Sequence, residues 1–352
     1  MNRFSILRHL YPALRDHQQV EHTLNQLLHH TLDGEYIQNK RPKLRLMSFF
    51  QRNFFSILFL SIYRSLGVAP QRRELYGVIN QSIRGIVTGT DNLLDDENKT
   101  MLPLAFPEQA HRFNSVMHIL LFDRFLEQVL EKAVDDAILT REDKDRIHRR
   151  IFSALVPIGA EEASEEGGVK EILTPEKILS TVHALKGGEL LRLAFITPCH
   201  IENTPQIHQA DRGIYKIGLA LQVIDDMTDL FEDLTLGHHN YLTSFIYHEG
   251  PADEQKRLAQ LSEEQSFSNL EIHKLFPVST RLVMHRAIGE ALEGFTILHD
   301  AGFWLTRKDS FSLIKDLFEL RGLAALLPLW PNYQPSMPGL PTTTPQADSE
   351  ST

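Results

Sequence analysis

The chain has 352 residues, of which 42% are hydrophobic and 23% charged, a balance typical of a folded globular protein and not of a disordered one. Its 36 Lys and Arg stand against 46 Asp and Glu, and the formal net charge of -10 argues against a nucleic acid partner, because no cationic surface for a phosphate backbone is expected. The single cysteine, Cys199, excludes an internal disulfide and a cysteine-based zinc site, and it favours a reducing, cytoplasmic environment.

Apolar residues recur at three- and four-residue spacing along nearly the whole chain, whereas the alternating pattern of β-strands is rare. The sequence therefore predicts an all-α fold. The expected helices are Arg3–Thr31, Lys43–Leu66, Arg72–Leu94, Glu108–Ala137, Arg141–Ile158, Pro175–Thr197, Gln206–Glu232, Asp253–Ser262 and Val278–Leu327, the last of them broken near Gly302 or between Thr306 and Asp309.

The most apolar stretch is Met47–Leu66, which polar residues such as Arg52 and Arg64 interrupt. A membrane-spanning helix needs about 20 predominantly apolar residues with few or no charges. We therefore expect a buried core helix here. A helix that dips into a membrane surface is the second interpretation, and peripheral membrane contact stays open.

The domain organisation follows from where the composition changes. No Pro/Gly/Ser-rich linker divides residues 1–330, so we expect a single all-helical domain. Residues 331–352 combine Pro with Thr, Ser and Gln, a composition that cannot form a core. We expect this segment to be a disordered tail.

Thr174, Pro175 and Glu176 predict the start of a helix, because Thr caps free amides, Pro suits the first helical position and Glu suits the positive helix end. This start places Lys186 about three turns inside the helix. The preceding acidic, glycine-containing segment, residues 161–168, is expected to be a solvated, flexible connection. The pair His238 and His239 is likewise expected to face solvent.

Two acidic clusters share one spacing. Asp91 and Asp95 lie four residues apart and so about 40° apart on a helix, with Asp96 and Glu97 following directly. Asp225, Asp229 and Asp233 repeat this pattern, with Asp226 beside the first of them. Each cluster ends an otherwise apolar helical segment.

The carboxylates within such a cluster repel one another, since the repulsion between two unit charges ~6 Å apart at an effective dielectric of ~20 is roughly 2 to 3 kcal/mol. A solvated helical face would explain one cluster, but two clusters of the same form in apolar helices favour a bound cation. Oxygen ligands without nearby Cys favour Mg²⁺, which typically uses one or two carboxylates together with water and substrate phosphates.

These motifs resemble those of the trans-prenyl diphosphate synthases, in the class I terpenoid synthase superfamily. Residues 221–229 (Leu-Gln-Val-Ile-Asp-Asp-Met-Thr-Asp) are similar to the family's second aspartate-rich motif. Residues 90–96 resemble the first motif, with Asn92 where an Asp is usual, and residues 185–191 resemble the segment whose lysine contacts the allylic diphosphate. Order and spacing agree across residues 40–245.

The resemblance implies a helical bundle around a deep central cavity, with three Mg²⁺ ions bridging the two motifs and a prenyl diphosphate. It implies a catalytic set of Asp91, Asp95, Asp225, Asp229 and Lys186. The implied metal ligands are Asp91, Asp95, Asp96, Asp225, Asp226 and Asp229. The implied substrate-binding residues are Lys43, Arg45, Arg84, Lys99 and Gln222. By analogy the protein is expected to be a homodimer.

The sequence departs from the family pattern at the second substrate's pocket. The Arg-Arg-Gly segment expected after the first motif is replaced by residues 97–103, where only Lys99 is basic. Arg84 stands where a histidine is expected, and the Gly-Lys pair after the second motif is Gly237-His238. Product length in the family depends partly on the positions held here by Ile86 and Val87, which supply no aromatic plug.

Three functions remain in consideration. The leading one is a Mg²⁺-dependent prenyltransferase that ionises an allylic prenyl diphosphate and condenses it with isopentenyl diphosphate in isoprenoid biosynthesis. The second keeps the ionisation but ends in cyclisation or head-to-head coupling, which the missing arginines permit. The third is a non-catalytic subunit of a heteromeric prenyl synthase.

Overall fold

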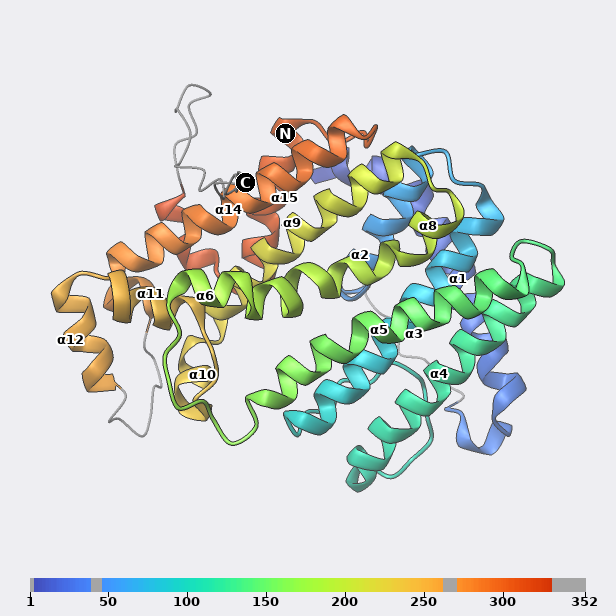
Figure 1. Ribbon diagram of the computed structural model, residues 1–352, viewed down its shortest axis with the longest axis horizontal. Coiled ribbons are helices and arrows are strands. Elements are labelled where there is room, and N and C mark those ends of the chain that lie inside the picture. The colour runs from blue at the N-terminus through green and yellow to red at the C-terminus, as the bar shows by residue number, and fades with distance from the viewer. Residues whose placement is uncertain (1–2, 39–45, 262–270, 331–352) are drawn as a thin grey trace, which may run out of the picture.

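The computed structural model describes residues 3–38, 46–261 and 271–330 as a bundle of helices (Figure 1). These residues form no β-strand, and their one extended pairing is an isolated bridge between Ile37 and Leu104. The all-α prediction is confirmed. Lys43, Arg45 and the expected tail at residues 331–352 lie outside the described residues, so the predictions that concern them stay predictions.

The long helices of the bundle have the bounds that follow. They are α1 (Arg3–Thr31), α2 (Leu46–Ser65), α3 (Pro70–Leu94), α4 (His111–Asp135), α5 (Arg141–Ser164), α9 (Pro205–Thr228), α14 (Pro277–Asp300) and α15 (Arg307–Leu320). The short helices are α6 (Pro175–Ser180), α7 (Leu190–Arg192), α8 (Ile196–Ile201), α10 (Leu230–Leu236), α11 (Tyr241–Glu249), α12 (Ala252–Leu261) and α13 (Ile272–Leu275).

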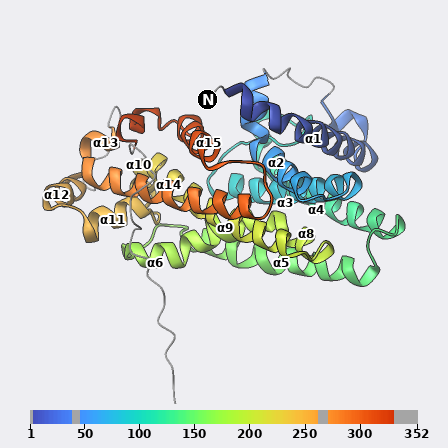
Figure 2. The ribbon, with the colours of Figure 1, turned by 90° about the horizontal axis from the view of Figure 1, so that it is seen from above.

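The bundle is elongated, with α9 packed along α14 and α3 packed along α4 as its most extensive helix pairs. In both ribbon views the short helices α10, α11 and α12 gather at one end and the turn between α4 and α5 lies at the other (Figures 1 and 2). Within the described residues, no helix combines the length and the apolar character needed to cross a membrane. The apolar α2 is a core helix as predicted, with Ile57, Leu58, Ile62 and Tyr63 almost fully buried.

Helix starts follow the capping chemistry in the sequence. The Thr174 side chain accepts a hydrogen bond from the amide of Lys177, which confirms the predicted start at Pro175. Thr140 and Asp143 form a reciprocal capping box at the start of α5. The expected break in the last long segment is also confirmed, because Gly302 adopts a positive φ of 111° and Thr306 caps α15.

The segment predicted as one helix over Pro175–Thr197 is instead a chain of short pieces. After α6 the chain turns at Thr181 and then passes through a π-helical segment, η3 (Ala184–Glu189), before α7. The prediction of a continuous helix was wrong because apolar spacing does not report such an insertion. The expected helix Gln206–Glu232 similarly divides at Asp229 into α9 and α10.

Contact between two backbones explains the η3 irregularity. A Cβ atom on Gly187 would lie 2.6 Å from the carbonyl oxygen of Gly218, and one on Gly218 would lie 2.2 Å from that of Gly187. Only glycine at both positions allows η3 to lie this close to α9. Lys186 is thereby held against the helix that carries the second acidic cluster, and π-helical insertions of this kind frequently occur at functional sites.

Candidate active site

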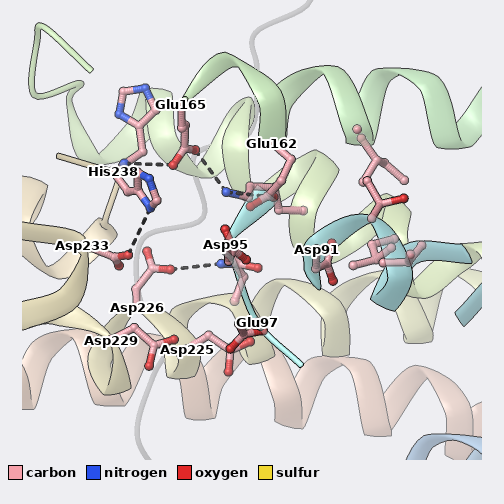
Figure 3. A pocket seen from close by; sticks show the side chains of 18 of the residues that line it. Asp91, Asp95, Glu97, Glu162, Glu165, Asp225, Asp226, Asp229, Asp233 and His238 are labelled. Carbon is pink, nitrogen blue, oxygen red and sulfur yellow. Dashed lines mark hydrogen bonds and ion pairs between the residues drawn. The ribbon is translucent and has the colours of Figure 1, made fainter. Parts of the chain in front are cut away.

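A pocket of about 610 Å³ lies where the C-terminal ends of α3, α5 and α9 meet η3 and α10. Among the described residues, ten carboxylate side chains line it against three cationic ones. The carboxylates are Asp91, Asp95, Glu97, Glu162, Glu165, Asp225, Asp226, Asp229, Glu232 and Asp233, and the cations are Lys99, Lys186 and Arg321. Figure 3 shows the two aspartate clusters on facing elements, with Glu162 and Glu165 of α5 beside them.

The structure brings most of the predicted site residues together. Both acidic clusters face the pocket, as do Lys186, Lys99 and Gln222. Asp96 does not, because it adopts a positive φ of 53° just after α3 and turns outward. Its carboxylate is largely exposed and accepts hydrogen bonds from the guanidinium of Arg112 at 3.1 and 3.2 Å.

Asn92, where the family pattern has Asp, performs a structural task that Asp could not. Its side chain is buried, its Nδ2 donates to the carbonyl of Lys99 at 3.0 Å, and its Oδ1 accepts from the amide of Lys99 at 2.9 Å. A carboxylate would lose the donated bond. Asn92 therefore folds the loop after α3 back along the pocket and places Lys99 in the lining.

Asp226 serves the architecture of the second cluster. Its carboxylate is buried and lies 2.8 Å from His183 Nε2, accepts from Gln222 Nε2 at 3.1 Å, and accepts from the amide of Tyr241. The amide group of Asn240 then donates to the Asp226 carbonyl and to Asp233 Oδ2, each at 2.7 Å. These bonds fix the end of α9 to α11.

Burial raises the pKa values of the pocket aspartates. For Asp91 burial, reinforced by the charges of Glu162 and Asp95, raises the pKa to about 7. Burial also raises the pKa of Asp225 to about 6, although the charge of Arg321 opposes this rise. For Asp95 and Asp229 the pKa is raised as well, with burial as the main cause.

Lys186 is held between two glutamates of α5. Its Nζ lies 3.0 Å from Glu162 Oε2 and 3.1 Å from Glu165 Oε1. Burial alone would lower the pKa of Lys186, but the two carboxylate charges and hydrogen bonds outweigh burial and raise it. The ammonium is therefore fully charged at neutral pH.

This arrangement corrects two expectations from the sequence. The segment predicted as a solvated acidic connection is helical as far as Ser164, and Glu165 is almost fully buried. The prediction failed because the compensating cation, Lys186, comes from another element. His238 and His239 were expected to face solvent, but both are half-buried and line the pocket, and the amide of His239 donates to Glu165 Oε2 at 3.3 Å.

A second, more apolar chamber of about 340 Å³ opens from the acidic pocket. Both cavities share Val87, Lys186, Leu190, Gln222, Asp225 and Arg321 in their linings. The chamber is walled by Phe55 and Phe59 of α2 and by apolar residues of α3, α7 and α9. The sequence did not predict that these two phenylalanines lie at the site, because α2 is outside both acidic motifs.

Arg84 lines this chamber and not the acidic pocket. Its Nη2 donates to the carbonyl of Arg52 at 2.9 Å, and burial together with the charge of Arg52 lowers its pKa. Arg321 was also missed from the sequence. Its Nη1 lies 2.7 Å from Asp225 Oδ1, although Arg321 caps the C-terminal end of α15 and lies almost a hundred positions further along the chain.

The donor set suits a hard divalent cation that shares its coordination with a ligand. The lining offers ten carboxylates against three described cations, so carboxylate oxygens and negative charge are in excess. Among the described residues no three His, Cys, Asp or Glu side chains converge closely enough to hold an ion by themselves. Mg²⁺ fits this pattern because it typically takes one or two carboxylates and completes its shell with water and phosphate.

Comparison with known proteins locates the fold. No protein-family model matches the chain, and no curated protein sequence does so either. Solved structures match clearly. A decaprenyl diphosphate synthase from Rhodobacter capsulatus is 13% identical, with a TM-score of 0.59 over 89% of this chain and 97% of its own. A polyprenyl synthetase from Streptomyces coelicolor A3(2) is 14% identical, with a TM-score of 0.58 over 86% and 97%.

A third match, a polyprenyl synthase from Caulobacter crescentus CB15 complexed with calcium and isoprenyl diphosphate, is 14% identical with a TM-score of 0.56, over 90% of this chain and 96% of its own. At these identities the likeness concerns the fold. It agrees with the resemblance in the two aspartate-rich motifs. The chain therefore has the helical fold of these prenyl diphosphate synthase structures.

Proposed function

We propose that the protein is a Mg²⁺-dependent prenyltransferase that ionises an allylic prenyl diphosphate and condenses it with isopentenyl diphosphate. The observation that carries this proposal is the junction of a carboxylate-lined pocket with an apolar chamber, with Lys186 at the boundary. An allylic diphosphate has a strongly anionic diphosphate end and an apolar hydrocarbon end. The two cavities match these two ends.

Asp91, Asp95, Asp225 and Asp229 would hold the metal, with up to three ions shared between protein and diphosphate. Bound Mg²⁺ would neutralise the charge that builds on the leaving diphosphate oxygens. Lys186 donates N–H bonds to the same oxygens once the diphosphate competes with Glu162 and Glu165 for its ammonium. Gln222 keeps Asp226 in place through its hydrogen bond of 3.1 Å.

The apolar chamber protects the allylic carbocation. Phe55, Phe59, Ile83 and Leu221 line it and would present an apolar surface to the cation. Arg84, Lys43 and Arg45 would also bind diphosphate, as the motif resemblance implies. The homodimer, a cytoplasmic location and any peripheral membrane contact stay predictions.

A second candidate is ionisation followed by cyclisation or coupling without isopentenyl diphosphate. The specific observation in its favour is that residues 97–103 supply Lys99 alone where the family has two arginines, while Arg84 faces the apolar chamber. Both features weaken the expected second diphosphate site and leave the ionisation machinery intact.

One assay distinguishes the candidates. Purified protein with Mg²⁺ is incubated with geranyl, farnesyl or geranylgeranyl diphosphate, each with and without isopentenyl diphosphate, and the products are separated by chromatography. Elongated diphosphates that require the second substrate support the proposal. Hydrocarbons or alcohols from the allylic substrate alone support cyclisation or coupling, and inactivity that a partner protein relieves supports a non-catalytic subunit.

A further inference from the structure

Arg321 is a cation at the active site that has no counterpart among the motif residues. It follows the last residue of α15, and its Nη1 lies 2.7 Å from Asp225 Oδ1. Its side chain is 43% exposed, against 28% for that of Asp225. Among the described ranges 3–38, 46–261 and 271–330, its one ion pair is with this aspartate.

The backbone at Arg321 is fixed by a helix-ending motif. The amide of Leu323 donates to the carbonyl of Phe318 at 2.9 Å and that of Gly322 to Glu319 at 3.2 Å, with Gly322 at a φ of 80°. This is the Schellman pattern, for which glycine is the favoured residue. Leu323 and Leu326 are buried just beyond it, so the chain is anchored on both sides of Arg321.

The position of Arg321 matches the end of a substrate that carries negative charge. Among the described residues, only Lys186 and Arg321 are cationic and line both the acidic pocket and the apolar chamber. Lys99 lines the acidic pocket but not the chamber, and Arg84 lines the chamber but not the acidic pocket. A prenyl diphosphate that spans the junction therefore has its oxygens within reach of these two cations.

The two cations differ in how tightly the protein holds them. Lys186 lies between Glu162 and Glu165 and is mostly buried, whereas Arg321 has an exposed side chain and one carboxylate partner among the described residues. The guanidinium can therefore reorient at lower cost. Its planar set of N–H donors also suits the bidentate recognition of phosphate oxygens better than an ammonium does.

We propose that Arg321 binds the allylic diphosphate and so replaces the arginine contact that this chain lacks after its first aspartate cluster. Without ligand it neutralises Asp225. Asp225 would hold Mg²⁺ when the ion is bound, and the Arg321 guanidinium would then donate to the diphosphate instead of to Asp225. This inference rests on the proposed function, because it assumes that the pocket receives a diphosphate.

Binding of inorganic pyrophosphate in the presence of Mg²⁺, measured by isothermal titration calorimetry, tests the inference without any turnover. Arg321→Ala should weaken binding about 10- to 100-fold, the range expected for losing hydrogen bonds to a charged group. Arg321→Lys keeps the charge but not the planar donors, and should lose about three- to tenfold. Lys315→Ala removes one exposed positive charge from the same helix and should bind like the parent.

The outcomes separate this inference from the proposed function. If the parent and Arg321→Ala bind pyrophosphate equally, Arg321 is not a diphosphate ligand, while the proposed function stands. If the parent itself does not bind pyrophosphate with Mg²⁺, the proposed function fails and this inference fails with it.

Steady-state kinetics of the charge-conserving variant provide a second measurement, which is independent of the stability of Arg321→Ala. Arg321→Lys should raise KM for the allylic diphosphate and leave KM for isopentenyl diphosphate unchanged. A rise confined to isopentenyl diphosphate would overturn the assignment to the allylic site. Circular dichroism before each titration identifies any variant that is not folded.

Discussion

The two acidic helix ends that face each other across the pocket are built differently. At the end of α9, Asp225 is paired with Arg321, and the neighbouring Asp226 accepts hydrogen bonds that tie α9 to α11. At the end of α3, Asp91 and Asp95 face Glu162, whose charge raises their pKa values further. The α9 end is thus tied together by an ion pair and hydrogen bonds, whereas at the α3 end the charge of Glu162 adds to the burial of both aspartates.

Residues within one acidic motif have two different roles, because some position the backbone and others direct carboxylate oxygens into the pocket. Asp226 and Asn92 stand inside the acidic motifs, but their hydrogen bonds position the backbone. Asp91, Asp95, Asp225 and Asp229 have oxygens directed into the pocket and carry the unfavourable charge. A substitution should therefore affect either turnover or folding, according to which group it alters.

The largest expected effect is on turnover. Asp91→Asn and Asp225→Asn should each lower kcat/KM about 1,000-fold or more, because each removes a carboxylate proposed to hold the metal that stabilises the leaving diphosphate. Both variants should remain folded. Product formation from an allylic diphosphate and isopentenyl diphosphate with Mg²⁺ measures the loss, and Asp123→Asn on the exposed face of α4 is the matched control. Retained activity in either variant would remove that residue from the mechanism.

The next largest effect should be on stability. The Asp226 carboxylate interacts with Gln222, His183 and the backbone amide of Tyr241. The side chain in Asp226→Asn has only one oxygen and cannot accept from all three. The substitution should therefore lower the free energy of unfolding by about 2–4 kcal/mol. The exposed Asp229→Asn should change it little. Urea denaturation followed by circular dichroism compares the two. Equal stability of both variants would contradict the structural role given to Asp226.

A smaller loss is expected when the family's usual residue is restored at the α3 end. Asn92→Asp removes the bond donated to the Lys99 carbonyl and places a charge in a buried site, so it should cost about 1–3 kcal/mol. Asn98→Asp makes the same chemical change at an exposed position of the same loop and serves as the control. An Asn92→Asp variant as stable as its parent would show that the loop does not depend on this amide.

The parts of the fold that were predicted from the sequence depend on local signals. Apolar spacing identified the long helices, and the capping residue Thr174 located the start of α6. The facing of the two acidic clusters followed from a motif resemblance and not from spacing alone. The η3 insertion was missed because its cause, the contact between Gly187 and Gly218, joins two segments about thirty residues apart.

The missed site residues share the same physical reason. Glu162 and Glu165 belong to a charge run that looks solvated, and only the position of Lys186 in space reveals their partner. Gly322 indicates that a helix ends near Arg321, but nothing in the sequence indicates that this helix end lies beside Asp225. The sequence therefore indicates whether a charged residue is solvated or paired only when its counter-ion lies nearby in the chain.

The smallest effect is a pH dependence that separates the two helix ends in the metal-free protein. The folded-state pKa of Asp91 is raised to about 7 and that of Asp225 to about 6, against about 3.9 in an unfolded chain. The folded state therefore keeps protons that the unfolded state has lost. The stabilisation from these protons is fully present below about pH 4 and is lost as the pH rises through about 6 to 7.

Other groups titrate in the same range, so the test is a difference between variants. With EDTA present, the unfolding free energy of Asp91→Asn relative to its parent should increase from pH 5.5 to pH 8, because the parent loses its bound proton and the variant has none to lose. Asp225→Asn should show the same trend at lower pH and with smaller amplitude, since Arg321 already compensates part of that charge. A difference independent of pH for Asp91→Asn would mean that the α3 end carries no electrostatic cost, and the contrast between the two ends would disappear.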